Sequence, residues 1–144
     1  MKYNQERHRD LLLKNQRKNH YENLELAEYG AAVELHFLWQ ERDQFVLLMK
    51  DFLNKNIDGD LFCGQVSGLR RELINRCEKF NLELISNSEK IKDFQPDERS
   101  ENLSDCLTGA YCECENFDDT EDYEEFYDSI KNQFLNFQQA LNKE

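Results

Sequence analysis

The sequence has little proline and glycine, with one proline and five glycines among 144 residues. β-Sandwiches and barrels need a turn residue roughly every ten positions, so this scarcity argues against them and favours long helices with short connections. The chain also lacks any apolar run near the roughly 18 residues that a membrane span requires. The cluster Leu11-Leu12-Leu13 is too short for a signal-peptide core. We therefore expect an intracellular, soluble, mostly helical protein.

Basic residues are scarce, since 18 Lys and Arg face 30 Asp and Glu, a net charge of −12. This charge argues against nucleic-acid binding by the body of the chain and favours a partner with a basic surface. The first twenty residues nevertheless carry +4, which leaves −16 for the rest. A basic arm before an acidic body is typical of an interaction tail. Because the arm offers only Leu11 to Leu13 for burial, we expect its removal to leave the core nearly as stable.

Apolar residues recur at helical spacing from Glu22 onward. The pattern predicts one long helix, or two abutting ones, over about residues 23–54, with Gly30 as the candidate break. Asp58 is placed to cap a following helix, and residues 80–85 are expected to form a short separate one. Ser100 and Thr120 are the predicted caps of two further helices, and residues 86–99 the main loop. The last helix carries an aromatic stripe: Tyr123, Phe126, Tyr127, Ile130, Phe134, Phe137 and Leu141.

These segments predict an all-α fold, an antiparallel bundle of four to five amphipathic helices with a polar N-terminal arm. We divide the chain into residues 1–40, the basic arm with an extra helix, and residues 41–144, an acidic helical-bundle domain.

One segment resembles a calcium-binding loop between two helices. It runs from Asn54 and has Gly59 at the sixth position. The twelfth position is Gln65, which cannot supply the bidentate carboxylate that closes such a site. A capped turn is the favoured interpretation, and no metal is predicted here.

The cysteines and histidines give no chemical site. Cys106, Cys112 and Cys114 lack the paired spacing of structural zinc ligands, and buried thiols are favoured instead. His8, His20 and His36 lie far apart in the sequence, and none is beside a Ser or Cys nucleophile. We predict no cofactor and no catalytic activity.

Acidic residues are densest between Asp97 and Asp128, where thirteen Asp or Glu face Arg99 alone. A solvated face that satisfies a helix dipole is one interpretation, and a partner-binding patch is the other, because clustered like charges are tolerated more readily beside a cationic partner. The candidate partner-binding residues are Glu113, Glu115, Asp118, Asp119, Glu121, Asp122, Glu124 and Glu125 in this stretch, and Arg7, Arg9, Lys14, Arg17 and Lys18 in the arm.

Several segments resemble the immunity proteins of the colicin D type. They are FLNKNIDGDLFC at 52–63, LRRE at 69–72, LSD at 103–105 and YCECENF at 111–117, followed by an acidic turn and a closing amphipathic helix. The resemblance covers about residues 42–142. It implies a small helical bundle that neutralises a tRNA-cleaving toxin, with its acidic surface in place of the RNA phosphates. Those proteins are shorter and have no counterpart of residues 1 to about 40.

We therefore expect a non-catalytic acidic subunit or adaptor that binds protein within a larger assembly. The alternative is an immunity-type inhibitor that occludes a basic nuclease active site. Abundant Asn, Lys, Glu, Ile and Phe are typical of an AT-rich genome. This composition predicts the plastid stroma as the location, with the bacterial cytoplasm as the alternative.

Overall fold

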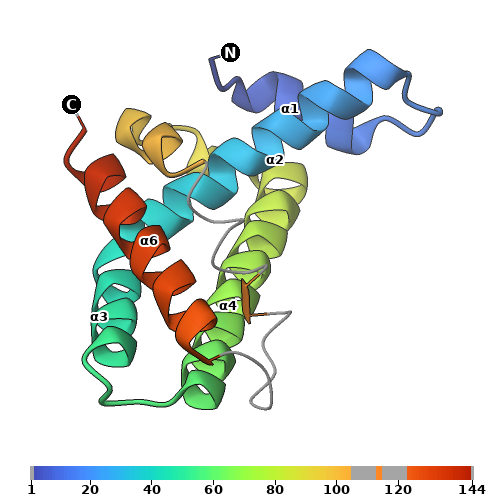
Figure 1. The fold of residues 1–144 in the computed structure, drawn as a ribbon. Coiled ribbons are helices and arrows are strands. Elements are labelled where there is room, and N and C mark those ends of the chain that lie inside the picture. The colour runs from blue at the N-terminus through green and yellow to red at the C-terminus, as the bar shows by residue number, and fades with distance from the viewer. Residues whose placement is uncertain (1, 105–112, 115–122, 144) are drawn as a thin grey trace.

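The computed structural model describes residues 2–104, 113–114 and 123–143, and no strand occurs within these ranges (Figure 1). The all-α fold predicted from the sequence is confirmed. The elements are the α-helices α1 (Gln5–Leu13), α2 (His20–Gln40), α3 (Arg42–Leu53), α4 (Gly59–Ser86) and α6 (Tyr123–Leu141), and the 3-10 helices η1 (Ser88–Ile91) and η2 (Glu98–Leu103).

Helices α3, α4 and α6 lie side by side, and α2 crosses over one end of them (Figure 1). A short turn joins α3 to α4, so these two helices are antiparallel, and α6 is also antiparallel to α3. The N-terminal half of α2 extends beyond the three helices and packs with α1 and the end of α4. The observed arrangement is thus a bundle of α3, α4 and α6, with α1 and α2 packed at one end of it.

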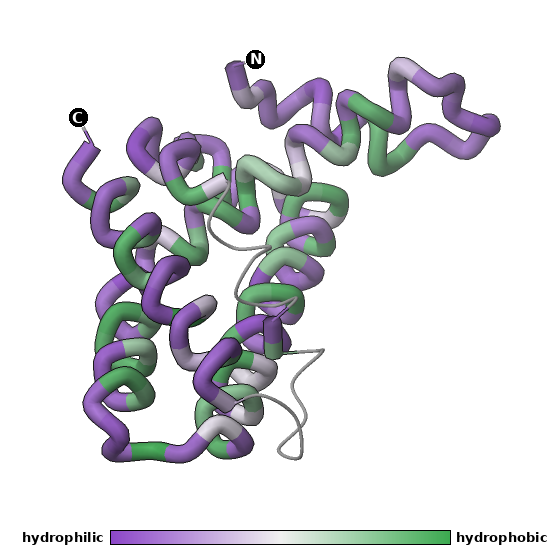
Figure 2. The backbone as a smooth tube through the Cα atoms, viewed as in Figure 1, coloured by the Kyte–Doolittle hydropathy of each residue, from purple (hydrophilic) through white to green (hydrophobic). Residues whose placement is uncertain are grey.

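The main hydrophobic core fills the space between α3, α4 and α6 and continues under α2 and η2. Phe52 of α3 is its centre, because this ring stacks on Phe62 of α4 at 4.7 Å and meets Phe126 of α6 edge-on at 5.4 Å. Each of these helices contributes apolar residues to this core, and hydrophobic positions alternate with hydrophilic ones along the helices (Figure 2). The aromatic stripe predicted for the last helix supplies much of this core.

A second core joins α1 to α2 and α4, and it was not predicted. Its buried apolar residues are Tyr3, Leu11, Tyr29, Val33, Phe80 and Leu84. His8 of α1 is also buried, and its ring stacks on Phe80 at 6.3 Å. The expectation that the first residues offer only Leu11 to Leu13 for burial is therefore wrong. Tyr3 and His8 were overlooked because each ring carries a polar group. They become core residues only when α2 and α4 surround them.

The sequence predicted one long helix or two abutting helices over about residues 23–54, and the structure has two, α2 and α3, but the candidate break at Gly30 is wrong. Gly30 lies inside α2, and the break between α2 and α3 falls at Glu41, where the backbone N–H bonds to Leu38 O at 2.9 Å. The Arg42 guanidinium donates to Trp39 O at 2.8 Å and lies over the indole ring at 4.5 Å. Tertiary packing sets this break, because residues 38–45 contain neither Gly nor Pro.

The start of α4 agrees with the prediction, since the Asp58 side chain accepts a hydrogen bond from Leu61 N at 2.8 Å. Residues 80–85 do not form a separate helix but are the end of α4. Within the predicted loop, η1 and the start of η2 are helical. Asp97 caps η2, whereas Ser100 is buried inside it and donates to Asp97 O at 2.6 Å, so the prediction of Ser100 as a cap is wrong.

Thr120, the predicted cap of the last helix, lies outside the described residues. No helix in the described part of the chain is long and apolar enough to cross a membrane.

Candidate binding surfaces

Two of the predicted partner-binding cations are paired within the chain. Arg7 forms an ion pair with Glu25 at 2.8 Å, and Lys14 forms one with Glu22 at 2.5 Å. These contacts hold the pKa of both carboxyl groups below their usual range, chiefly through the hydrogen bonds from Lys14 and Arg7. The pairs fasten α1 and the chain that follows it to the start of α2.

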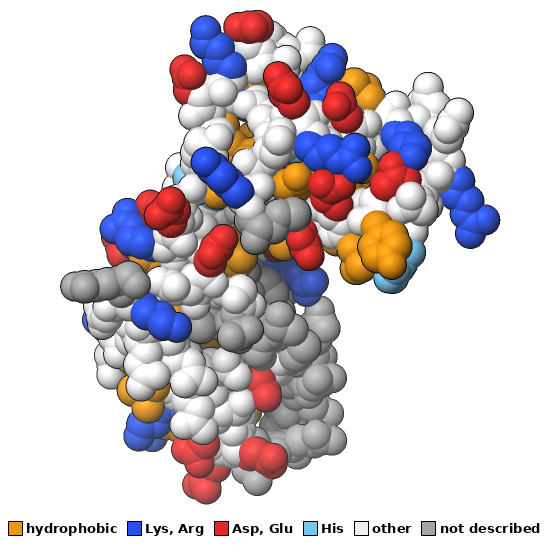
Figure 3. All heavy atoms as spheres, turned by 90° about the horizontal axis from the view of Figure 1, so that it is seen from above, with side chains coloured by type: hydrophobic (Ala, Val, Ile, Leu, Met, Phe, Trp, Pro, Cys, Tyr) orange, Lys and Arg blue, Asp and Glu red, His pale blue; other side chains and the backbone are white. Residues whose placement is uncertain are grey.

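The other predicted cations lie nearby but differ in their surroundings. Arg17 is exposed and Lys18 half-buried in the connection between α1 and α2, whereas Arg9 lines a hollow beside η1. Seen from the end that carries α1, Lys and Arg side chains are interspersed with Asp and Glu (Figure 3). The basic side chains on this face do not form one continuous patch.

Only part of the predicted acidic patch belongs to the described residues. Glu124 and Glu125 are exposed in the first turn of α6, where a carboxylate interacts favourably with the helix dipole, and Glu113 is half-buried. The other members, Glu115, Asp118, Asp119, Glu121 and Asp122, lie outside the described residues.

Two of the three histidines have structural partners. The Tyr3 hydroxyl lies 2.9 Å from His8 Nδ1, and burial lowers the pKa of His8 to about 4. The ring is thus neutral near pH 7. His36 Nδ1 accepts from Asp97 N at 3.0 Å, and burial lowers its pKa as well. Both rings therefore position chain segments, and His20 lies exposed at the start of α2.

The cysteines bring one unpredicted contact. The thiols of Cys63 in α4 and Cys114 form a hydrogen bond, which together with burial raises the pKa of Cys114. Both side chains pack against the main core. Cys106 and Cys112 lie outside the described residues.

The segment that resembles a calcium loop forms a tight turn between α3 and α4. Lys55 adopts φ 63°, the left-handed conformation, and Asn56 N bonds back to Asp51 O at 2.9 Å. Because α4 begins at Gly59, positions six to twelve of the candidate loop are already helical. A calcium loop needs these positions to wrap around the ion. The segment therefore has the geometry of a capped turn.

An apolar groove separates α3 from α6 on the outer side of the bundle. It is a hollow of about 550 Å³, and its apolar lining residues are Leu53, Tyr127, Phe134 and Leu135. A second hollow of about 560 Å³ lies beside α1 and is lined mostly by polar residues. Tyr127 fixes one end of the groove, because its hydroxyl donates to Leu53 O at 2.7 Å. From Tyr127 to Gln138 the groove follows α6 for about 17 Å, or three helical turns.

The charged side chains that line this groove are Lys50 of α3 and Lys131 of α6, both exposed. Lys55 adds a third cation at the Tyr127 end, with Nζ 6.0 Å from the ring centroid. No Asp or Glu lines the groove among the described residues, although the chain as a whole carries −12. The groove is therefore a local basic and apolar surface on an acidic protein.

Sequence reasoning did not find this groove. The stripe on the last helix was recognised, but Tyr127 and Phe134 were not separated from its core positions, and Leu135 was not singled out. A usable signal was the width of the stripe. Tyr127 and Phe134 lie beside the line of Phe126, Ile130 and Phe137, so this helix has more apolar face than a single neighbour covers.

Chemical groups that could act together are sparse in the described part of the chain. Among those residues, no three His, Cys, Asp or Glu side chains are grouped so as to hold a metal ion. In comparisons with known proteins, the chain matches no family model, no curated protein and no solved structure.

Proposed function

We propose that this protein is a non-catalytic protein-binding subunit that holds an amphipathic helix of its partner in the groove between α3 and α6. The observation that carries the proposal is the groove itself, which is lined by apolar side chains and flanked by lysines. Leu135 on its wall is 48% exposed. Apolar grooves about three turns long between two helices are a recurring site for partner helices, which insert residues at positions i, i+3 or i+4 and i+7.

The charges specify the kind of helix. Lys50 and Lys131 stand on opposite walls, so a partner helix with Glu or Asp beside its apolar stripe meets a cation on each side. Such rim charges contribute more to the association rate and to the choice of partner than to affinity, while the central apolar anchors supply most of the binding energy. A helix flanked by Lys or Arg would be repelled at the same positions.

The acidic stretch before α6 supports a second contact with the same partner. Residues 113–125 carry eight acidic candidates, and the chain enters α6 at the Tyr127 end of the groove. We propose that this stretch contacts a basic surface of the partner. If that surface is a nuclease active site, the protein is an inhibitor of the immunity type, and the resemblance noted in the sequence favours that alternative. A subunit of a larger assembly, in the plastid or in a bacterium, remains our first proposal.

Two synthetic helical peptides test the groove. Both carry Leu at i, i+3, i+4 and i+7, one with Glu and the other with Lys at the flanking positions. With the isotope-labelled full-length protein, we expect the Glu peptide to shift amide resonances of α3 and α6 and to bind at least about tenfold more tightly than the Lys peptide, a difference of about 1.4 kcal/mol. The difference should shrink in high salt because screening weakens exposed charge pairs.

Matched variants localise the binding. Leu135→Glu changes the groove wall, whereas Leu82→Glu changes a comparably exposed leucine on α4, 66% exposed and remote from the groove. Lys131→Glu has the control Lys79→Glu, an exposed lysine of α4. Groove variants should abolish the Glu-peptide shifts, and the α4 variants should leave them intact. The proposal fails if neither peptide perturbs α3 or α6, or if the α4 variants weaken binding as much as the groove variants.

A further inference from the structure

We infer that the polar hollow between α1 and η1 is a binding site for a small polar molecule that carries one carboxylate group, and that Arg9 receives this carboxylate. The hollow has a volume of about 560 Å³, large enough for a molecule of dipeptide size. It is separate from the groove between α3 and α6, and the inference does not depend on the proposed function.

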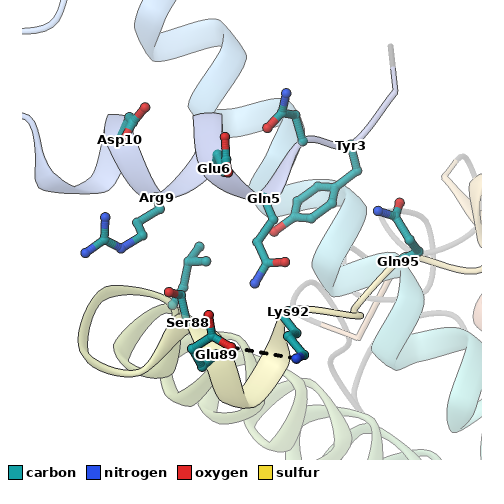
Figure 4. Close-up of a pocket in the computed structure, with 11 residues that line it drawn as sticks. Tyr3, Gln5, Glu6, Arg9, Asp10, Ser88, Glu89, Lys92 and Gln95 are labelled. Atoms are coloured by element: carbon teal, nitrogen blue, oxygen red, sulfur yellow. Dashed lines mark ion pairs between the residues drawn. The ribbon is translucent and has the colours of Figure 1, made fainter.

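The walls come from elements that are far apart in the sequence. Helix α1 supplies one side, η1 and the chain after it supply the other, and Leu84 of α4 forms part of the base. Gln5 joins the two sides, because its Nε2 donates to Ile91 O at 3.1 Å. Figure 4 shows Gln5 extending from α1 toward η1, whereas the Arg9 side chain leaves the same side of α1 and turns along the helix. These two residues are one helical turn apart and therefore share a face of α1.

Arg9 differs from Arg7, Lys14 and Lys92 in having no carboxylate partner among the described residues. Arg7 and Lys14 pair with α2, and Lys92 lies 3.8 Å from Glu89, whereas Arg9 forms no ion pair within the described part of the chain. Its Nε is shielded from solvent and has no hydrogen-bond partner there. Because Nε is closed to solvent while Arg9 as a whole is only half-buried, a carboxylate in the hollow meets the two terminal nitrogens of the guanidinium, which offer it an end-on fork.

The remaining lining residues limit the charge of the ligand. Glu6 and Asp10 also border the hollow, but both project from α1 away from η1 in Figure 4, so they form its outer rim. Glu89 on the opposite side is paired with Lys92. A rim with these carboxylates disfavours a dianion such as phosphate more than a monoanion. The uncharged groups Asn4, Ser88 and Gln95 suit amide or hydroxyl groups on the rest of the molecule.

The test uses three probes on the full-length protein: N-acetylglycylglycine with its free carboxylate, the same peptide as its C-terminal amide, and inorganic phosphate. Binding is followed by NMR through the Nε–H resonance of Arg9 and the amides of α1 and η1. We expect the carboxylate peptide to shift these resonances in a saturable way. The amide form should bind at least about tenfold more weakly, since a hydrogen bond between two charged groups is stronger than one to a neutral amide.

Two substitutions assign the effect to Arg9. Arg9→Gln removes the charge and should weaken carboxylate binding about tenfold or more, and Arg9→Lys, which keeps the charge but lacks the fork, should restore only part of it. Arg71→Gln on the exposed side of α4 is the control and should change nothing. The melting temperature of each variant shows whether it is folded. Equal binding of the acid and the amide, or unchanged binding in Arg9→Gln, overturns the inference. Tighter binding of phosphate than of the carboxylate peptide overturns the assignment of the ligand.

Discussion

Replacing Leu11 by Ala tests whether α1 is an integral part of the fold. Leu11 is 1% exposed and packs in the second core with Tyr29 and Phe80, whereas Leu13, two residues later in the same helix, is 39% exposed. If residues 1–20 were an unpacked basic arm that only contacts a partner, replacing either leucine by Ala would leave the stability unchanged. If α1 is packed as a helix, only Leu13→Ala would be tolerated.

The magnitude follows from burial. Removing a fully buried leucine side chain costs about 2 to 5 kcal/mol, from the lost transfer free energy and the cavity left behind. The second core lies at the edge of the molecule and can partly close around the gap, so we expect about 2 to 3 kcal/mol for Leu11→Ala. For Leu13→Ala we expect less than about 1 kcal/mol, since much of that side chain is already in water.

Urea unfolding followed by two probes distinguishes global from local loss. Trp39 is the single tryptophan and belongs to the main core, so its fluorescence reports that core, while far-UV circular dichroism reports all helices. A nine-residue helix is marginal alone and depends on its packing. If α1 detaches first in Leu11→Ala, the dichroism transition begins at lower urea than the fluorescence transition, and α1 amides lose protection from hydrogen exchange.

Equal shifts of less than about 0.5 kcal/mol for Leu11→Ala and Leu13→Ala, with α1 amides unprotected in the wild type, would refute the packing of α1 described above. The same reasoning applies to removal of residues 1–19. That truncation uncovers Tyr29, Phe80 and Leu84, so we now expect a large loss of stability where the sequence alone suggested almost none.

Three further changes have definite expected outcomes. The folded-state pKa of His8 is about 4, below its usual 6.5, so unfolding takes up a proton between these values. The stabilisation from neutral His8 should be fully present above pH 6.5, and the free energy of unfolding should fall by up to about 3 kcal/mol as the pH drops to 4. Urea unfolding at each pH gives this profile, and subtracting the profile of His8→Gln isolates the contribution of His8. Parallel profiles of the two proteins would contradict this assignment. Gly30→Ala should raise the free energy of unfolding by about 0.5 to 1 kcal/mol, because a Cβ there meets nothing within 4 Å inside α2. A destabilised protein would mean that the helix is not continuous at Gly30. Asp58→Ala should cost about 1 kcal/mol through loss of the α4 cap, and Asp58→Asn much less, as measured by thermal melts. Equal losses in both variants would instead assign the effect to the charge of Asp58.

The sequence by itself determined the features that depend on neighbouring residues. The scarcity of Gly and Pro, together with apolar positions at helical spacing, predicted an all-α protein. Asp58 was identified as a cap because an N-cap acts on N–H groups only two or three residues away. The inward face of the last helix was likewise visible, since residues three and four apart lie on one side of a helix.

Only the tertiary structure decided the features that depend on residues distant in the chain. The break at Glu41 has no local breaker, and it arises where α2 and α3 pack against different neighbours. Tyr3 and His8 look like arm residues until Tyr29 and Phe80 surround them. The groove exists because Leu53 and Phe134, eighty-one positions apart, line the same hollow. Burial and cavities are properties of assembled surfaces, and a local pattern shows which residues are apolar without showing which of them remain uncovered.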